Sequence, residues 1–267
     1  KLSSIGPTAL MVMAMTEHAE ITGTRDWDAP IEGFGAYILS IQSEDGSWSE
    51  GARLQWEQLH KALWNLYEHT GDETYLDALE ATGRWHLEHR QDTGEDDPFE
   101  YPYLYGLWAA EPLTELYDLR PGDWIPELVF SVGDEVVAQQ WTPANNDEPD
   151  WMGGYWANPP NEDGSPNWNH TLKLEATIDC WRLADKVGDE QRAFEYRRSA
   201  LIGAEHMQRW QLRAEETAGW PDEALPVGGM PLYAYDPSIR IDIPSHGGVA
   251  MMKVVKYLGL EEYPGTY

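Results

Sequence analysis

A repeated unit of helix, glycine turn and helix runs through most of this sequence and constrains its fold more than any other feature. The clearest copy spans residues 71–91: it begins with a Gly-Asp pair, continues through an amphipathic segment of about five turns and ends at a glutamine. The same frame recurs over residues 188–208 and, with weaker similarity, over 23–42 and 122–140. An apolar periodic segment precedes each glycine, over residues 11–22, 56–70, 103–119 and 171–187. Repeats of this length indicate stacked helix hairpins that bury their apolar faces against one another.

The Gly-Asp junction explains how each hairpin turns. Glycine adopts a left-handed conformation at a helix end without a Cβ penalty, and aspartate caps the next helix by accepting from its first N–H groups. The short turns should therefore lie on one face of the fold. The long connections should then lie on the opposite face, and they span residues 43–55, 92–102, 141–170 and 209–245. Binding and catalytic groups often lie on long loops held by a rigid scaffold, so we expect the functional site on that face.

These patterns predict an all-α fold, an (α/α) barrel or toroid of helix hairpins, with residues 1–267 forming a single domain. Inner helices are expected over 7–22, from about 53 to 70, and over 103–119, 171–187 and 247–258, and the first should be buried nearly all round. About five inner and four outer helices fall short of six complete pairs. The barrel is therefore expected to be incomplete, open, or completed by residues outside this sequence. Residues 238–243 alternate like a short strand.

The charge of the chain limits its partners. With 47 acidic and 18 basic residues, the formal net charge is −29. Nucleic-acid binding and attachment to anionic membranes both need clustered Lys and Arg, so neither is expected. The acidic residues are spread along the whole chain, which is typical of proteins that work in high salt; an ordinary acidic protein is the alternative.

Two further features bear on the compartment. No apolar stretch approaches the roughly 20 residues that span a bilayer, so we expect a soluble protein without membrane insertion, either cytoplasmic or exported. The sequence begins with Lys1 rather than Met, which leaves open a removed leader or upstream segment. The single cysteine, Cys180, cannot form an intrachain disulfide and is expected to be a small buried apolar side chain.

One short motif carries a family resemblance. Tyr37 and Ile38 are followed by Gln42, Gly46 and Trp48, in the spacing aromatic, hydrophobe, three residues, Gln, three residues, Gly, one residue, Trp. This spacing is similar to the QW motif of the terpenoid cyclase and protein prenyltransferase toroids. The helix-pair repeat equally resembles the six-hairpin glycosidases, lyases and sugar epimerases that share an (α/α) barrel. The resemblance implies the fold, but the chemistry has to be argued from the site.

Several acids and histidines precede or open the predicted inner helices, so a toroid would bring them to one mouth. The candidate catalytic residues are Glu57, Glu100 and Asp242 as an acidic centre, with His60 and His246 as proton-transfer groups. The candidate substrate-binding residues are Trp48, Trp56, Tyr101, Tyr103, Trp156, Trp168, His170, Glu175, Tyr235 and Arg240. Aromatic rings stack on the apolar faces of sugars while polar groups meet the hydroxyls, so a glycan is the expected substrate.

The reaction type stays open at this point. Hydrolysis would need two carboxylates flanking the bond, one of them protonated. A lyase or an epimerase would need a histidine or tyrosine to move a proton beside a carboxylate. Arg240 would suit a uronate, because its planar guanidinium pairs with a carboxylate through two bonds. Helix capping and loop packing are the structural alternative for all of these acids and rings.

Isoprenoid chemistry is the second hypothesis, and a non-catalytic glycan-binding or scaffold protein the third. Asp96, Asp97 and Glu100 resemble a relaxed form of the Asp-rich motif of prenyl synthases, but Pro98 would break the helix that holds such a motif. Asp-x-Asp-Asp occurs nowhere in the sequence, and Asp179 and Cys180 are placed too deep in their helix for a zinc site at the mouth. No cofactor or metal is therefore predicted, and the oligomeric state is open.

Overall fold

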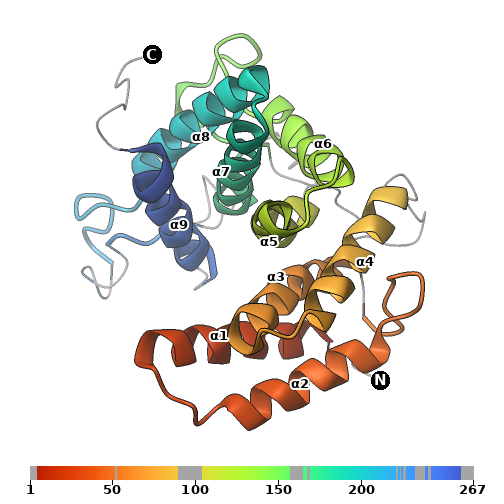
Figure 1. The fold of residues 1–267 in the computed structure, drawn as a ribbon. Coiled ribbons are helices and arrows are strands. Elements are labelled where there is room, and N and C mark those ends of the chain that lie inside the picture. The colour runs from red at the N-terminus through yellow and green to blue at the C-terminus, as the bar shows by residue number, and fades with distance from the viewer. Residues whose placement is uncertain are drawn as a thin grey trace. The chain divides into compact units, whose positions relative to one another are not determined.

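The computed structural model describes residues 5–51, 53–89, 104–156, 165–166, 169–220, 222, 224, 227–231, 238–239 and 242–259. Within these residues the chain is helical, with only isolated β-bridges and no strand. The α-helices are α1 (Ile5–Thr22), α2 (Asp28–Ile41), α3 (Arg53–Thr70), α4 (Thr74–Glu88), α5 (Leu104–Leu119), α6 (Trp124–Ala138), α7 (Asn169–Val187), α8 (Glu190–Trp210) and α9 (Asp242–Lys253) (Figure 1). A 3₁₀ turn, η1 (Pro149–Trp151), and a π-helical turn, η2 (Val254–Leu258), complete the elements.

The chain divides into two compact units, Lys1–Ser131 and Val132–Tyr267, and the boundary falls inside α6. In the first unit, α3 packs against both α1 and α5, while α2 and α4 lie beside their partners α1 and α3. Leu59, Leu63 and Leu66 of α3 are completely buried there. In this unit α1, α3 and α5 thus form an inner layer, and α2 and α4 form an outer layer. That a single domain spans the chain stays a prediction.

In the second unit, α7 lies between α8 and α9 (Figure 1). All of residues 169–180 are buried, polar and apolar alike. This burial on every side was expected of α1 instead, where Leu10 and Met11 are about half exposed. The reason is contact on two sides: α7 has one helix on each flank, so even its polar positions are enclosed.

The predicted glycine turns are present in three of the four repeats. Gly23, Gly71 and Gly188 have φ between 68° and 75°, the left-handed region in which a Cβ is penalised. Asp189 caps α8 by accepting from the N–H of Arg192 at 3.1 Å. The fourth glycine, Gly122, is not among the described glycines with positive φ, so the most degenerate repeat turns differently.

A polar clamp joins the end of α2 to α4. The side chain of Gln42 donates to the carbonyl of Ala78 at 2.9 Å, and the indole of Trp48 donates to the hydroxyl of Thr82 at 3.0 Å. Gly46, at φ 88°, fits so closely that an added Cβ would lie 2.3 Å from the carbonyl oxygen of Ala81. The QW-like motif is therefore a structural device that fixes one outer helix to the next.

The same clamp recurs after α6 with a longer insertion. Gln140 donates to the carbonyl of Ser199 on α8 at 2.9 Å, and Gly153, at φ 87°, approaches the carbonyl of Ile202. The hydroxyl of Tyr155 takes the position of the Trp48 indole and lies 3.0 Å from the hydroxyl of Ser199. In the last repeat, Gln211 rather than the predicted Gln208 closes the helix and donates to the carbonyl of Gly228 at 2.8 Å.

Replacing Gly46 with alanine is expected to destabilise the protein by roughly 3 kcal/mol or more, because a Cβ at positive φ would also clash with a backbone carbonyl. Urea unfolding monitored by circular dichroism measures the change. The matched control is Gly33→Ala: this exposed glycine lies inside α2 with no atom near its Cβ position, so alanine should stabilise by about 0.5–1 kcal/mol. Equal changes in the free energy of unfolding at the two positions would contradict the close packing of Gly46 against α4.

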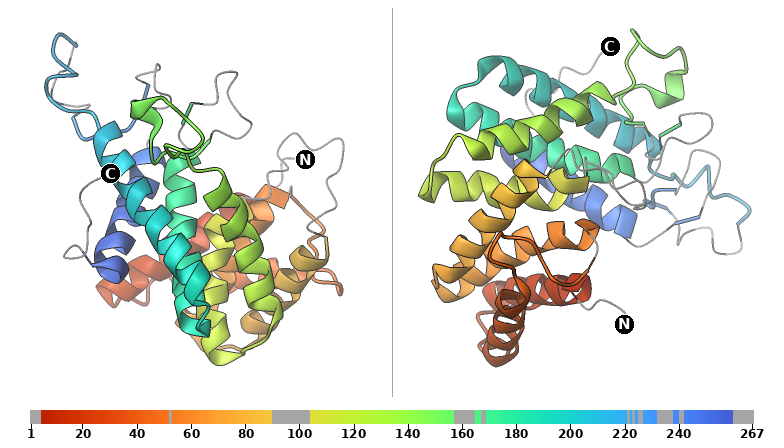
Figure 2. Two further views of the ribbon diagram at one scale, coloured as in Figure 1. Left: turned by 90° about the horizontal axis from the view of Figure 1, so that it is seen from above. Right: turned by 90° about the vertical axis from the view of Figure 1, so that its right-hand side faces the viewer.

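The loops of the second unit meet the prediction that they share one face. The segment 139–156 contacts the C-terminal half of α8 through Gly153 and Gly154, and Gly228 contacts Gln211 at the end of the same helix. Figure 2 shows both loops at that end of α7 and α8. The predicted strand over 238–243 is wrong, since Asp242 and Ile243 already belong to α9. Asp242 and Pro244 both suit the first turn of a helix, which explains the early start.

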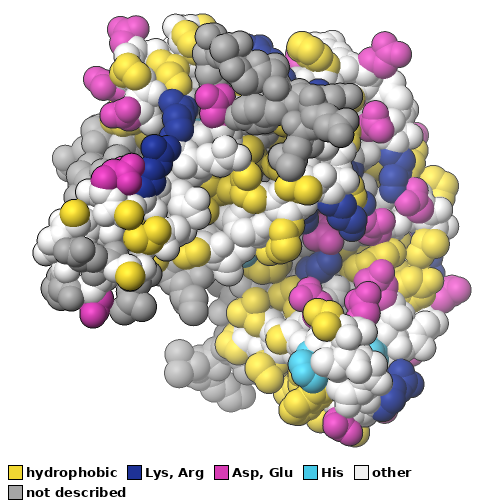
Figure 3. Space-filling view, turned by 90° about the vertical axis from the view of Figure 1, so that its left-hand side faces the viewer, with side chains coloured by type: hydrophobic (Ala, Val, Ile, Leu, Met, Phe, Trp, Pro, Cys, Tyr) yellow, Lys and Arg dark blue, Asp and Glu magenta, His cyan; other side chains and the backbone are white. Residues whose placement is uncertain are grey.

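Acidic side chains are scattered over the face shown in Figure 3, among Lys, Arg and apolar groups, rather than gathered into one block. Because salt screens repulsion between exposed charges, the melting temperature is expected to rise from low to multi-molar potassium chloride. Thermal melts at several salt concentrations measure this, and a flat or falling melting temperature would contradict a high-salt adaptation.

Across the described residues, no helix is both long and apolar enough to cross a bilayer.

Candidate functional site

A network of charged side chains joins α7 to α9 in the second unit. Nδ1 of His246 lies 3.1 Å from Oε2 of Glu175, whose other oxygen accepts from Nζ of Lys253 at 3.3 Å. Lys253 also donates to Oδ2 of Asp179 at 2.5 Å, and Arg182 donates to the other oxygen of that carboxylate at 3.1 Å. The helical repeat explains the alignment, since Glu175 and Asp179 are four residues apart on α7. His246 and Lys253 are seven residues apart on α9 and therefore share a face as well.

The contact with Glu175 indicates which nitrogen of His246 carries the proton in the neutral ring. An ionised carboxylate only accepts hydrogen bonds, so Nδ1 donates to Glu175 and Nε2 becomes the basic nitrogen. The ammonium of Lys253 also donates to Glu175, at the oxygen that His246 does not contact. His246 keeps 19% of its side chain exposed, whereas Glu175 keeps 8% and Asp179 none. The histidine is thus oriented by a buried acid and is itself reachable from solvent.

A second cluster in the first unit contains two of the predicted catalytic residues. Glu57 and His60 are one turn apart on α3, and both are buried. Nδ1 of His60 lies 3.3 Å from the backbone carbonyl of Glu57, and its Nε2 lies 3.3 Å from Nδ1 of His86 on α4. The two imidazoles are stacked with centroids 4.9 Å apart. Donation from His60 to the carbonyl leaves its Nε2 to accept from His86, so the chain of bonds suits neutral rings.

Burial keeps Glu57 and His60 uncharged. It raises the pKa of Glu57 well above its usual value, and Oε2 has no hydrogen-bond partner within the described part of the chain. Burial also lowers the pKa of His60 to about 4, against the opposing effect of its bond to the Glu57 backbone. A protonated carboxyl beside a neutral imidazole combines a proton donor with a proton acceptor, and a catalytic role for both residues stays a prediction.

Glu57→Gln should make stability less dependent on pH. The native carboxyl stays protonated above pH 4.5 while the unfolded one ionises, so the stability of the parent falls as the pH rises above that value. The variant lacks this loss. Its free energy of unfolding relative to that of the parent should therefore increase by up to about 1.4 kcal/mol per pH unit. Urea unfolding at pH 5 and pH 7 measures the difference. The exposed Glu17→Gln is the control, and an advantage equal at both pH values would show that Glu57 ionises in the folded protein.

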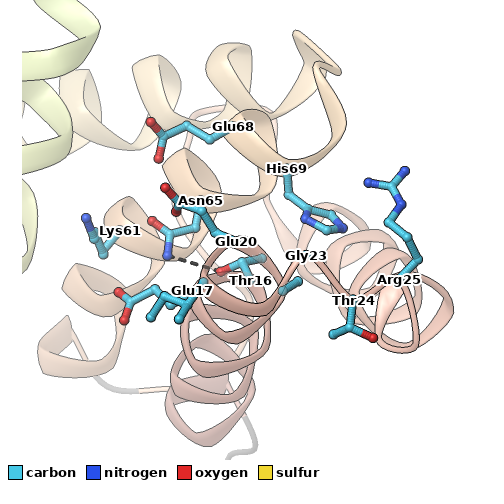
Figure 4. A pocket seen from close by; sticks show the side chains of 12 residues that line it. Thr16, Glu17, Glu20, Gly23, Thr24, Arg25, Lys61, Asn65, Glu68 and His69 are labelled. Atoms are coloured by element: carbon cyan, nitrogen blue, oxygen red, sulfur yellow. Dashed lines mark hydrogen bonds between the residues drawn. The ribbon is translucent and has the colours of Figure 1, made fainter.

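A cavity of about 770 Å³ in the first unit lies between the C-terminal halves of α1 and α3 (Figure 4). Its wall includes Glu17, Glu20 and Glu68, with Asn65 donating to Thr16 at 3.2 Å as drawn. Burial raises the pKa of Glu68, with Lys61 opposing the shift. Neither Glu57 nor His60 lines the cavity, and Arg25, Lys61 and His69 stand among its carboxylates. None of the site residues selected from the sequence lines it.

The predicted aromatic and polar binding residues have varied surroundings. Trp48 is 4% exposed within the clamp, so it packs as core. Trp56 is half-buried; its indole donates to the carbonyl of Glu50, and its ring meets Trp85 edge-on. Trp156 is exposed, whereas His170 is buried, with its Nε2 3.0 Å from the carbonyl of Gly203. A substrate-binding role for each of these residues stays a prediction.

Six of the predicted site residues lie outside the described residues: Glu100, Tyr101, Tyr103, Trp168, Tyr235 and Arg240. Asp242 begins α9, but its side chain lies outside the described part as well. The acids of the prenyl-synthase-like motif, Asp96 and Asp97, are also among the undescribed residues. The structure therefore brings together two sets of predicted residues, Glu57 with His60 and Glu175 with His246.

Three residues in these clusters were not singled out from the sequence, or were placed away from the site. Lys253 is seven residues from His246, a spacing that could have indicated a shared face. The sequence placed Asp179 too deep in its helix to reach the mouth of the toroid. At that position it accepts a hydrogen bond from Lys253. His86 faces His60 from a different helix, and nothing in the sequence indicated that contact. Among the described residues, no group of three potential ligands could hold a metal ion.

Comparison with known proteins supports the fold. No protein family model and no curated protein matches the sequence. Among solved structures, a crystal structure of D-mannose isomerase is similar over 96% of this chain and 72% of that chain, with 14% identity and a TM-score of 0.66. The predicted fold class is thereby confirmed as an all-α toroid of helix hairpins. At this identity the likeness concerns the fold alone.

Proposed function

We propose that the protein is a sugar isomerase or epimerase that works by proton transfer, with His246 as the proton-transfer group and Glu175 as its positioning residue. The observation that carries the proposal is the Glu175–His246 pair, in which a buried carboxylate orients a partly exposed imidazole. Its setting in a fold shared with D-mannose isomerase supports the substrate class. The protein is accordingly proposed to act on a free monosaccharide.

The chemistry fits a single base. Interconversion of an aldose and a ketose removes the C2 hydrogen as a proton and returns a proton to C1, while the hydroxyl proton of O2 passes to O1. Atoms and electrons balance without an oxidant. A neutral imidazole whose Nδ1–H is held by a carboxylate accepts a proton on Nε2 and returns it as the imidazolium. Glu175 stabilises that imidazolium, and Lys253 and Asp179 hold the carboxylate in place.

The experiment is incubation with D-mannose, D-glucose and D-fructose in deuterated water, followed by proton NMR and chromatography of the sugars. We expect interconversion of at least one aldose with its ketose or epimer, accompanied by deuterium at C1 or C2. Deuterium enters only if a proton leaves carbon, so the label separates isomerisation from simple binding. Absence of both interconversion and label for all three sugars would count against the proposal.

Hydrolysis and elimination are other outcomes of the same assay when neutral and acidic oligosaccharides are added. Hydrolysis needs one carboxyl held protonated beside the scissile bond and a second one ionised. Glu175 and Asp179 instead both accept hydrogen bonds from the ammonium of Lys253. The geometry of the α7–α9 network thus favours proton transfer by histidine over glycoside hydrolysis.

A further inference from the structure

A second cavity of about 340 Å³ lies in the second unit, at the C-terminal end of α8. Its walls come from His206, Arg209 and Trp210 at that end, from Asp150 and Trp151 of η1, and from the segment after α8. The cavity lies on the α8 side of α7, whereas Glu175 contacts α9 on the other side. It is therefore distinct from the His246–Glu175 pair.

Two tryptophans give this cavity apolar surface. Trp151 and Trp210 are both half-buried and both line it. Trp151 is fixed by packing against Trp141, with ring centroids 5.9 Å apart, and Trp210 is held 5.8 Å from the ring of His206. Indole faces held in this way bind the C–H faces of a pyranose ring, because the ring is apolar above and below while its hydroxyls point outward.

His206 supplies an unused polar group at the same cavity. Its side chain is 3% exposed, and neither imidazole nitrogen makes a hydrogen bond of normal geometry within the described part of the chain, although the backbone of Met152 lies near the ring. Burial lowers its pKa to about 4, assisted by Arg209 and opposed by the backbone of Met152, so the ring is neutral near pH 7 and offers one donor and one acceptor. A buried polar group without a partner is unfavourable, and a ligand hydroxyl would relieve that cost.

The loop that brings the cavity together depends on glycine. A Cβ on Gly154 would lie 2.6 Å from Pro166 and 2.9 Å from Nε2 of His206, so only glycine lets the chain pass so close to the imidazole. Charged groups stay at the rim: Arg209 and Asp150 are exposed, and Arg209 donates to the carbonyl of Met152. Aromatic faces and a neutral imidazole inside, with opposite charges at the edge, suit an uncharged ligand rich in hydroxyls.

We propose that this cavity is a binding site for an uncharged pyranose unit, held between Trp151 and Trp210 with a hydroxyl on His206. The site binds sugar without transforming it, and it does not rest on the proposed isomerase activity. The volume accommodates one or two sugar rings, consistent with the lower range of small-molecule sites. The competing occupant is an ordered water bonded to His206, which would leave the tryptophans without a role.

Methyl α-D-mannopyranoside and methyl α-D-glucopyranoside are the probes, because their blocked anomeric carbon prevents ring opening and isomerisation. Binding is followed by tryptophan fluorescence and by saturation-transfer NMR on the full chain. We expect saturable binding of at least one glycoside, weakened tenfold or more by Trp151→Leu and by His206→Leu. His246→Asn and Trp27→Leu, the latter at an exposed position in the first unit, should bind like the parent.

Three results would overturn the site. They are no saturable binding of either glycoside up to about 100 mM, binding that survives Trp151→Leu unchanged, and binding that His246→Asn removes. The last would assign the sugar to the α7–α9 network instead. Circular dichroism checks that each variant folds, and Trp151→Leu, at a half-buried position in η1, keeps the test decisive if His206→Leu does not fold. Failure of the isomerase assay together with binding here would leave this site standing.

Discussion

Replacing His246 with asparagine is expected to lower kcat for sugar isomerisation by a factor of about 10²–10⁴, the usual contribution of a general acid or base. Asparagine keeps a polar group next to Glu175 but cannot accept the proton on carbon. KM should change far less than kcat, because the proton-transfer group acts chiefly in the transition state. Steady-state kinetics on whichever sugar the parent turns over measure both constants.

Glu175→Gln and His18→Asn make this test specific. An amide at position 175 can still accept from Nδ1 of His246, so kcat should fall less than in His246→Asn. The lost negative charge disfavours the imidazolium, and the acid limb of the kcat profile should move to lower pH. His18 is exposed on α1, so its replacement should leave the kinetics unchanged. Full activity in His246→Asn would reject the proposed base.

Acid is expected to destabilise the protein strongly through three buried histidines. Burial lowers the pKa of His60 and His206 to about 4 and that of His170 well below its usual value of 6.5. The unfolded chain binds protons on these rings as the pH falls below 6.5, whereas the folded chain resists them. Stability is therefore fully present above pH 6.5 and is lost as the pH falls toward 4. His60 and His206 should each contribute about 3 kcal/mol to that loss.

His206→Leu isolates one of these contributions. Leucine fills the space without a titrating group. The free energy of unfolding of the variant, relative to that of the parent, should therefore increase by about 3 kcal/mol as the pH falls from 7 to 4. Comparing variant with parent at each pH cancels the opposite slope that Glu57 imposes. Urea midpoints at four pH values measure the gain, with the exposed His18→Leu as the control. A difference that stays constant with pH would mean that His206 is protonated in the folded state.

The hairpin repeat was predictable because its signals are local. Gly71 and Gly188 take the left-handed conformation that their position before a capping aspartate indicates. The helix bounds follow from periodicity, with deviations of a few residues at the starts of α1 and α9. The early start of α9 shows the limit of this approach, since an alternating pattern over 238–243 competed with an acidic residue and a proline that favour a helix start.

The site was only partly predictable because its contacts join distant segments. His246 and Glu175 were both selected from the sequence, but as separate candidates, and their pairing depends on how α9 packs against α7. Glu57 and His60 were expected at an open mouth, whereas α4 covers them with His86. Trp48 was selected as a candidate sugar-binding residue, and the spacing within its motif did not indicate that its indole donates to Thr82 on another helix. The sequence shows residue types and spacing on one helix, not which neighbouring helix encloses them.

The glutamine clamps also bear on how far such a sequence can drift. Gln42 and Gln140 donate to main-chain carbonyls of α4 and α8, and Gly46 and Gly153 pack against carbonyls one turn further along. Every residue offers the same main-chain carbonyl, whatever its side chain. The clamped helix can therefore change its surface residues without losing these contacts. Heavy enrichment in carboxylates, and an identity of only 14% with a protein of similar fold, are then compatible with clamps that depend on main-chain carbonyls.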